Sequence, residues 1–402
     1  MKKVILVIFT LTLIFSSHLN SQVLPGASFL RGMPGARMHA MSGTATAGLD
    51  YIHSIYANPG IAGFMREGQW SATFTNWIAD VYNASFVYGR RIRTPWSRMS
   101  RFSLGIRYQG MEEFDSTDGA APVATANDLV VSAMIGQPLT ALSKWLSAGV
   151  NLKYFQSNLD YFSANAFIID AGLFYRTPRF NMPLNGLGIF EKGIVSTGVS
   201  MINLGGDLTY ISVGTPLPRA FRGGVSLNAG THRGLQTQIS MDYIKYRDED
   251  GGIRMGFEIS WNRIFALNAG YQKSESLLRQ ATFGLSINLD DIAIPLGGLM
   301  PKTASALRFD VATQDEKEVL SRTYRGSVSN YSIGPEAFRL QWPVENAFYE
   351  HDSLVFTWEP SRDPDIYDDV AYHLLAGRDS TKMANLLDDI RFNNISPSSY
   401  EV

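Results

Sequence analysis

The sequence predicts an all-β fold: a transmembrane antiparallel β-barrel of about fourteen strands, with an export signal before it and a small β domain after it. Three observations lead to this prediction. The 402-residue chain has 36 glycines and 12% aromatic residues but only 18% charged residues, a composition that favours β structure over a helical bundle. An alternation of apolar and polar residues recurs between residues 70 and 313. The chain opens on two lysines and an apolar run, as exported proteins do.

The first element is the expected signal peptide, residues 1–21. Lys2 and Lys3 precede an apolar run at residues 4–15, and a serine-rich stretch follows it. The run is shorter than the ~20 apolar residues that a transmembrane helix needs, so its length is typical of a signal peptide and not of a membrane anchor. We expect cleavage near Ser21 and export of the mature protein. No other segment of the sequence approaches the length of a transmembrane helix.

Residues 22–69 come next and differ in composition from the rest of the chain. Within them, residues 32–64 are dense in glycine, alanine and serine and show no sustained helical or strand period. The segment also contains hydrophobic residues, so it is not typical of a disordered linker. Small residues suit packing into a confined space, and the strands that follow would supply such a space. We therefore expect an N-terminal hatch, or plug, that must move if anything is to pass.

The barrel is predicted from residues 70–313. The alternation is clearest at residues 102–109, 253–261 and 281–289, where every second side chain is apolar. Weaker copies lie at residues 70–76, 84–88, 129–136, 146–154, 167–175, 195–201, 221–229, 239–243, 265–271 and 307–311. These segments make about thirteen strands. Because bacterial outer-membrane barrels have even strand numbers, we expect fourteen strands, one of them without a clear pattern.

The two faces of these strands differ in chemistry. One face is apolar and often ends in an aromatic residue, and the other consists of Ser, Gly, Asn and Thr with scattered charges. A soluble β-sandwich or propeller would show the same alternation and is the alternative fold. In a membrane barrel the apolar face meets lipid, the polar face lines the lumen, and closure pairs the backbone groups. The charged residues expected to face the lumen and to pair there are Arg107, Lys153, Asp170, Arg222, Asp242, Arg254 and Glu258.

The chain continues beyond the expected barrel. Residues 314–334 are polar and are expected to form a linker. Residues 335–402 contain short alternating runs, such as residues 354–358, and resemble the first half of a fibronectin type III-like β-sandwich. The segment is too short for the usual seven strands of that fold. We therefore expect a partial domain, and a natural chain that continues past Val402.

Several classes of function lack support in the sequence. The chain has no cysteine and no His-Glu-x-x-His motif, so disulfides, thiolate chemistry and a zinc site are not expected. Phosphate-binding loops and the Gly-x-Ser-x-Gly motif of hydrolases are also absent from the sequence. A net charge of −2 without a long basic run argues against nucleic acid as a partner. We expect no enzyme activity, no metal and no cofactor.

The hatch region carries a resemblance to a known family. Residues 35–43, 47–50 and 54–64 resemble the N-terminal signature of the PorV/PorQ family, whose members are outer-membrane barrels similar to the FadL long-chain fatty-acid transporters. The positions that match the motif are Arg37, Met41, Gly43, Asn58, Pro59 and Gly60. The resemblance implies a fourteen-stranded barrel with an internal N-terminal plug, in the outer membrane of a Gram-negative-type bacterium. The family commonly has Asn-Pro-Ala where this chain has Asn-Pro-Gly.

The resemblance also implies one of two functions. PorV/PorQ-like members serve the type IX secretion system, in which they carry exported cargo or support its attachment to the cell surface. FadL-like relatives instead pass hydrophobic small molecules through the barrel wall. The expected partners are therefore secretion machinery or exported cargo proteins in the first case, a hydrophobic ligand in the second, and outer-membrane lipid in both.

Overall fold

The structure is a computed structural model that describes part of the chain. It describes residues 26–401 except for residues 49–51, 67, 78–80, 95–96, 112–124, 183–189, 232–233, 274–279, 291–304, 315–322, 333–339, 343–354, 359–371, 377–389 and 396–398. The expected signal peptide lies outside the described residues.

Within the described part, four short helices come first and strands follow. The helices are η1 (Ser28–Arg31), α2 (Ala36–Ala40), η2 (Ile52–Tyr56) and η3 (Pro59–Phe64). The strands are β1 (Gln69–Asn76), β2 (Val81–Thr94), β3 (Ser97–Met111), β4 (Ala126–Pro138), β5 (Leu146–Leu159), β6 (Phe162–Arg176), β7 (Phe180–Asn181), β8 (Lys192–Gly205), β9 (Leu208–Thr209), β10 (Gly214–Thr215), β11 (Ala220–Gly230), β12 (Leu235–Tyr246), β13 (Gly252–Trp261), β14 (Phe265–Lys273), β15 (Gln280–Asp290), β16 (Ser305–Gln314), β17 (Thr323–Ser332), β18 (Leu340–Trp342), β19 (Val355–Trp358), β20 (Tyr372–Ala376), β21 (Ile390–Ile395) and β22 (Ser399–Glu401). None of these helices has the length and apolar character needed to span a bilayer.

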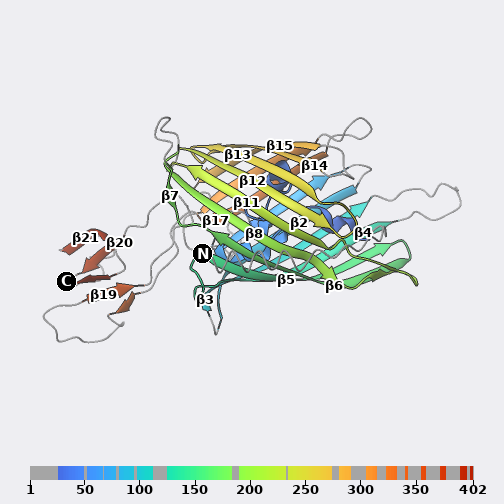
Figure 1. Cartoon of the computed structure of the whole chain (residues 1–402), viewed down its shortest axis with the longest axis horizontal. Coiled ribbons are helices and arrows are strands. Elements are labelled where there is room, and N and C mark those ends of the chain that lie inside the picture. Colours follow the sequence, from blue (N-terminus) through green and yellow to red (C-terminus); the bar gives the residue numbers. More distant parts are fainter. Residues whose placement is uncertain are drawn as a thin grey trace.

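Fourteen of the strands form one closed antiparallel ring. Neighbours in the chain pair from β1 to β6, β6 pairs with β8, β8 with β11, and neighbours pair again from β11 to β17. The ring closes where β17 pairs with β1, with Phe74 opposite Gly326. Short β7 adds to the edge of β8, and β9 and β10 form a small hairpin between β8 and β11. Figure 1 shows the wall strands tilted around a common axis, as closure requires.

The ring has two distinct ends. Strands β2, β4, β6, β11 and β13 begin at one end, which we call the mouth end, and the β9–β10 hairpin precedes β11 there. At the other end β1 begins and β17 finishes, so the chain leaves the barrel there toward β18.

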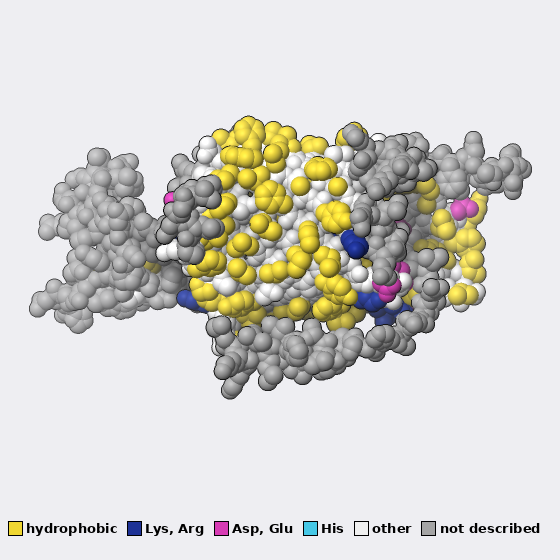
Figure 2. All heavy atoms as spheres, turned by 45° about the horizontal axis from the view of Figure 1, so that its top comes forward, with side chains coloured by type: hydrophobic (Ala, Val, Ile, Leu, Met, Phe, Trp, Pro, Cys, Tyr) yellow, Lys and Arg dark blue, Asp and Glu magenta, His cyan; other side chains and the backbone are white. Residues whose placement is uncertain are grey.

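The outer face of the wall is apolar. The large side chains that alternate with the lumen-facing ones are well exposed, for example Leu152 at 56% and Phe283 at 57%. Figure 2 shows hydrophobic side chains spread over the wall, with the charged ones of this face near the ends. A soluble sandwich or propeller would bury these side chains, whereas a membrane barrel turns them toward lipid. The prediction of a fourteen-stranded antiparallel barrel is therefore confirmed, and the exterior points to a position in the outer membrane.

Each of the thirteen predicted segments lies within one wall strand, and β17 is the fourteenth. The expected boundaries at the end of the barrel are wrong. Residues 323–332, expected in a linker at 314–334, pair with β1 and β16, so the barrel extends to Ser332 and not to residue 313. The outer face of β17 has Gly326 between Tyr324 and Val328, so its apolar alternation is too weak to recognise in the sequence.

Strands β18 to β22 follow the barrel. Strands β18, β19 and β22 form one small sheet, and β20 pairs with β21 in another. A β structure in this region agrees with the sequence pattern. The likeness to a fibronectin type III domain stays a prediction, because most of the intervening residues lie outside the described part of the chain.

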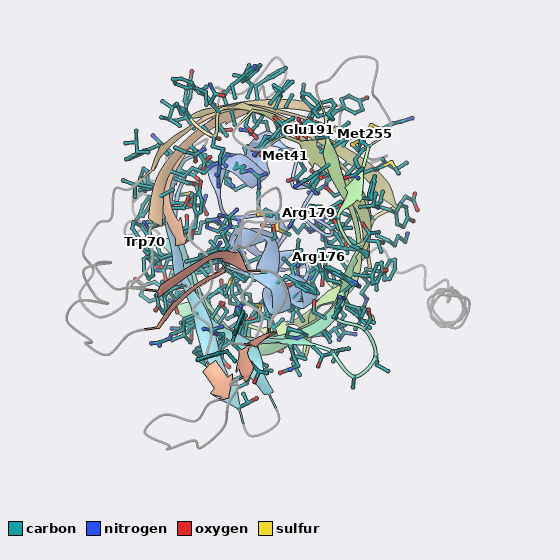
Figure 3. The ribbon with its side chains drawn as sticks, turned by 90° about the vertical axis from the view of Figure 1, so that its left-hand side faces the viewer. Met41, Trp70, Arg176, Arg179, Glu191 and Met255 are labelled. Atoms are coloured by element: carbon teal, nitrogen blue, oxygen red, sulfur yellow. The ribbon has the colours of Figure 1, made fainter. Side chains whose placement is uncertain are left out.

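The N-terminal residues lie inside the ring. We call residues 26–66 the lumenal segment. Its helix η3 packs against β3 to β6 and β8, α2 against β14 to β17, and η2 against β1 and β2, and most of the described side chains of the segment are buried. The view along the barrel in Figure 3 shows Met41 within the ring. The segment starts at the mouth end, where the Gly26 amide donates to the Pro216 carbonyl (3.1 Å), and it reaches the opposite end at Met65.

Candidate functional site

The lumen contains buried ion pairs between neighbouring strands. The Lys153 ammonium lies 2.5 Å from the Asp170 carboxylate, and the Arg222 guanidinium lies 3.0 Å from that of Asp242. All four side chains are at most about 5% exposed. Buried charges are costly unless they are paired and hydrogen-bonded, and Asp170 also accepts from the Asn203 amide at 2.8 Å. The two charges of each pair therefore neutralise one another.

Two wall carboxylates bind the lumenal segment. Glu258 accepts from Arg37 through both oxygens, at 2.6 and 2.7 Å, and from Arg308 at 3.0 Å. Bidentate arginine–carboxylate pairs are among the stronger polar contacts in proteins. Burial alone would lower the pKa of Arg37, but the Glu258 carboxylate outweighs burial and raises it above its ordinary value. Arg37 is therefore charged at any physiological pH.

Asp242 holds the middle of the segment. Its Oδ2 accepts from the backbone amides of Ala45 and Thr46 at 3.0 Å each and from the Thr46 hydroxyl at 2.6 Å. Arg222 donates to the Gly43 carbonyl at 2.7 Å, and Gly43 itself has φ +73°, a left-handed conformation that favours glycine. These contacts fix a backbone that has no regular secondary structure of its own.

Asn58 fastens the segment to β6. Its Nδ2 donates to the carbonyls of Thr46 and Leu173, and its Oδ1 accepts from the Gly60 amide, each at 2.9 Å. Asn58 thereby caps η3, in which Pro59 occupies the first turn, a position where proline costs no hydrogen bond. The Gly60 carbonyl in turn accepts from Ser147 at 2.5 Å. The Asn-Pro-Gly motif is thus an attachment point between the segment and the wall.

Glycines on the wall let the segment approach the strand backbones. At ten of them, on ten different strands, an added Cβ would lie less than 3.0 Å from an atom of the lumenal segment. We call this set the glycine belt: Gly89, Gly105, Gly136, Gly149, Gly172, Gly198, Gly224, Gly256, Gly270 and Gly284. Real Cβ atoms essentially never make such contacts, so any side chain at these positions would displace the segment or the wall.

The belt follows the segment around the lumen. From β2 to β15 the belt glycines meet Met65, then Tyr56 and Ala62, then residues 58–59, then Thr46, Thr44 and Ser42, and finally Ala40. From Ala40 to Met65 the segment therefore runs around the inside of the wall from β15 back to β2. Strands β12, β16, β17 and β1 contribute no glycine to the belt. This close packing makes the segment part of the barrel's interior.

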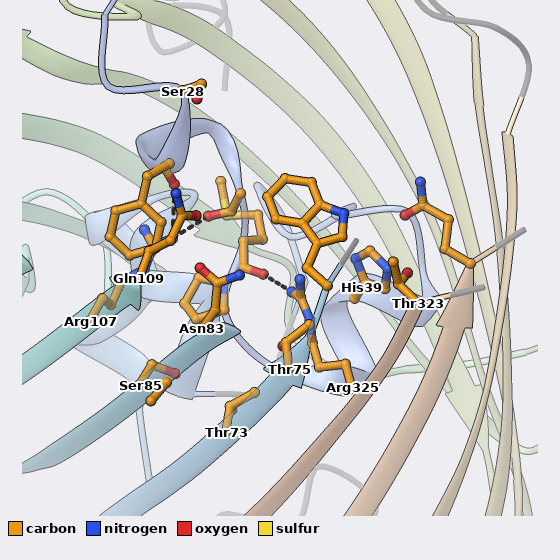
Figure 4. Close-up of a pocket in the computed structure, with 17 residues that line it drawn as sticks. Ser28, His39, Thr73, Thr75, Asn83, Ser85, Arg107, Gln109, Thr323 and Arg325 are labelled. Carbon is orange, nitrogen blue, oxygen red and sulfur yellow. Dashed lines mark hydrogen bonds between the residues drawn. The ribbon is translucent and has the colours of Figure 1, made fainter. Parts of the chain in front are cut away.

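A cavity lies at the mouth end, between strands that lack a belt glycine (β16, β17 and β1) and two that carry one (β2 and β3). It has a volume of about 140 Å³ and lies between η1, α2 and strands β16, β17, β1, β2 and β3. Figure 4 shows its lining, with Arg107, Gln109 and Asn83 on one side and Arg325 and Thr323 on the other. We call it the mouth cavity. Its polar walls and two guanidinium groups distinguish it from the apolar exterior.

Both arginines of the mouth cavity also hold the segment. Arg107 Nη2 donates to the carbonyls of Phe29 (3.1 Å) and Gly32 (2.7 Å), and its guanidinium lies over the Phe29 ring at 4.5 Å. Arg325 donates to the Met33 carbonyl. Each side chain therefore reaches from the wall to the start of the lumenal segment.

An apolar groove lies on the outer face of the same sector. It has a volume of about 540 Å³ and is lined by residues of β17, β1, β2 and β3, among them Phe74, Phe86 and Ile106. Thr73, Ala84 and Ser85 line both this groove and the mouth cavity. We call the groove the outer groove. Only the small side chains and backbones of β1 and β2 separate it from the mouth cavity.

The structure places all thirteen sequence-predicted residues inside the ring. Arg37, Asn58, Pro59 and Gly60 contact the wall as described, Met41 is 1% exposed beside Gly256, and Arg254 donates to the Ser42 carbonyl at 3.4 Å. Of these residues only Arg107 lines the mouth cavity. The other lining residues were not singled out from the sequence, and Arg325 lies on the unrecognised strand β17. Among the described residues, no cluster of His, Asp or Glu could hold a metal ion.

Comparison with known proteins gives structural neighbours only. No family model and no curated protein matches the chain. Among solved structures, the TodX deltaS2S3 mutant monoaromatic hydrocarbon channel is 12% identical, with a TM-score of 0.45, over 74% of this chain and 97% of that one. A FadL homologue from Pseudomonas aeruginosa is 8% identical, with a TM-score of 0.44, over 78% and 100%. CdiB from Acinetobacter baumannii is 10% identical, with a TM-score of 0.37, over 65% and 59%. All three TM-scores lie below 0.5, so no role is inferred from these structures, and the PorV/PorQ resemblance rests on its motif residues alone.

Proposed function

We propose that this protein transfers small hydrophobic or amphipathic molecules through its barrel wall, between the mouth cavity and the membrane. The observation that carries the proposal is the shared lining of the mouth cavity and the outer groove. Thr73, Ala84 and Ser85 border both spaces, and none of these side chains is large. A molecule in the cavity is therefore one strand thickness away from an apolar surface that faces lipid.

The packing of the lumen favours this route over an axial one. The lumenal segment follows the glycine belt around the wall and is tied to it by Glu258, Asp242 and Asn58. A path along the barrel axis would have to break these contacts. In the structure the pairing of β1 with β2 is continuous, with Thr73 opposite Ser85, so passage through the wall requires these two strands to separate locally.

A disulfide lock tests the route. The chain has no cysteine, so the double substitution Thr73→Cys and Ser85→Cys introduces the only possible disulfide. We expect oxidation to stop uptake of hydrophobic small molecules by cells that carry this barrel, and a reductant to restore it. The matched control is Ser226→Cys with Ser240→Cys, a facing pair on β11 and β12 whose hydroxyl oxygens lie 2.9 Å apart. Uptake that is unchanged by the first lock would refute passage between β1 and β2.

Deletion of the gene tests the function itself. Cells that lack the protein should take up at least one lipid or aromatic compound more slowly, and the wild-type gene should restore the rate. Unchanged uptake across a panel of such compounds would remove transport as a function.

A second candidate function is a role in type IX protein secretion or surface attachment. The PorV/PorQ-like motif at Arg37 and Asn58 motivates it, and so do the strands that follow the barrel. Pull-down of the native barrel from its own organism should then recover proteins with a C-terminal secretion signal. If the organism makes such proteins and none is recovered, this candidate fails.

A further inference from the structure

Arg107 differs from the paired lumen cations Lys153 and Arg222. Lys153 and Arg222 each lie within 3.0 Å of a carboxylate oxygen. Among the described residues, the contacts of Arg107 are two backbone carbonyls and the rings of Phe29 and Tyr56. Asp170 acts on it electrostatically but is bonded to Lys153. Arg107 is 6% exposed, and a buried charge without a paired countercharge is costly.

The mouth cavity next to Arg107 is suited to an anion. Among the described residues that line it none is acidic, and Arg325 supplies a second guanidinium on the opposite wall (Figure 4). Two buried polar atoms of its lining, Ser85 Oγ and Gln109 Oε1, have no hydrogen-bond partner in the described part of the chain. Buried polar atoms in native proteins are usually satisfied. A ligand carboxylate would pair with the Arg107 guanidinium and accept a hydrogen bond from Ser85 Oγ, whereas Gln109 Oε1 is itself an acceptor and would need a donor.

The size and the remaining lining limit what the ligand can be. A volume of about 140 Å³ holds a compact molecule and excludes a long acyl chain. Phe29, Met33 and Trp77 add apolar surface beside the polar wall. We propose that the mouth cavity binds a small organic anion, with its carboxylate on Arg107 and a short apolar body against these side chains.

This inference names a ligand class for the proposed transport function. The role of the site in the cell rests on that function, whereas the binding itself does not. Binding to the purified protein and uptake by cells are separate measurements. Binding without uptake would refute transfer through the wall and leave the site standing. Uptake of neutral compounds without binding of the anion would refute the site and leave transfer through the wall standing.

The test is calorimetric titration of the purified full-length barrel in detergent with benzoate. Neutral benzamide and inorganic phosphate are the comparison ligands. We expect benzoate to bind at one site, benzamide to bind at least about tenfold more weakly, and phosphate not to compete. A charge-assisted hydrogen bond is worth about 1.5–3 kcal/mol, which corresponds to roughly a tenfold or larger change in affinity. Equal binding of benzamide, no binding of benzoate, or binding of phosphate in its place would overturn the proposal.

Two substitutions locate the site. Arg107→Gln should weaken benzoate binding about tenfold or more, whereas Arg90→Gln, which removes the same charge from an exposed position on β2, should leave it unchanged. Because Arg107 also holds the lumenal segment, Gln109→Glu provides a second variant that keeps this side chain. The new carboxylate would pair with Arg107 and should abolish binding while the barrel keeps its heat-modifiable mobility on gels. Wild-type affinity in a folded Gln109→Glu variant would contradict the proposed site.

Discussion

The glycine belt makes a specific prediction about Gly172→Ala on β6. An added Cβ at this position would lie 2.0 Å from Asn58 Oδ1 and 3.2 Å from Pro59 Cδ. A contact of 2.0 Å cannot persist, and β6 is paired on both sides, with β5 and β8. We therefore expect the Asn58 side chain to move, because it is the more mobile of the two groups.

The magnitude follows from the hydrogen bonds that Asn58 makes. Its amide forms three, to the Thr46 carbonyl, the Leu173 carbonyl and the Gly60 amide. Each hydrogen bond is worth roughly 0.5–1.5 kcal/mol, and more where a buried group is left unsatisfied. Alanine at a strand position recovers about 0.4–1 kcal/mol by restricting the unfolded chain. We expect Gly172→Ala to lower the free energy of unfolding by about 2–3 kcal/mol.

Urea unfolding of the barrel in lipid vesicles, followed by tryptophan fluorescence, measures this change. Gly326→Ala is the matched control, because Gly326 also lies in a wall strand and an added Cβ there meets no atom within 4 Å. The control should be neutral or slightly stabilising. If both variants unfold at the same urea concentration, the lumenal segment does not depend on close contact with the wall, and the reasoning from the belt is wrong.

Three further predictions concern the same interior. Gly60→Ala, which restores the Asn-Pro-Ala form of the motif, should destabilise this barrel, because its Cβ would lie 2.8 Å from the Leu173 backbone carbon; urea unfolding against wild type checks it. Lys153→Met should lower the free energy of unfolding by about 3–5 kcal/mol, because it leaves the Asp170 carboxylate buried without its partner. Adding Asp170→Asn should recover part of that loss in the same measurement. Burial, with Arg107 and Arg325 nearby, lowers the pKa of His53 to about 3, so the unfolded chain binds a proton that the folded one does not between that value and about 6.5. His53 should therefore not lower the free energy of unfolding above about pH 6.5, and it should lower it by roughly 2 kcal/mol at pH 5. This pH dependence should be absent in His53→Gln.

The wall could be predicted from sequence because each strand carries its own pattern. In residues 253–261, for example, apolar and polar side chains alternate without interruption, and β13 has these positions almost unchanged. Strand β17 was missed for a local reason: glycine takes the place of an outward-facing apolar residue at position 326. The polar–apolar alternation reports the two-sided environment of a strand, and it fails where one side is nearly empty.

The interior could be predicted only in outline. The sequence shows that Gly105, Arg107 and Gln109 share one face, but it does not show that Gly105 meets Tyr56 while Arg107 reaches the carbonyl of Gly32. Such pairs lie more than forty positions apart in the chain and depend on where the segment crosses each strand. The same limit applies to the mouth cavity, whose walls come from five strands and two helices.

The structure also bears on which part of the barrel would move during the proposed transfer of small molecules. The sequence suggested a soft hatch that shifts to let molecules pass. Unseating the lumenal segment would break the bidentate Arg37–Glu258 pair and the contacts of Asp242 and Asn58, at a cost of several kcal/mol because charged groups are involved. Separating β1 from β2 around Thr73 breaks a few backbone hydrogen bonds, and each backbone group left unpaired toward lipid would cost several kcal/mol. The mouth cavity and the outer groove meet at Thr73 on β1, which lacks a belt glycine, and at Ala84 and Ser85 on β2, which carries Gly89. Both movements are therefore costly, and the disulfide lock between residues 73 and 85 distinguishes the proposed opening of the wall from a shift of the segment.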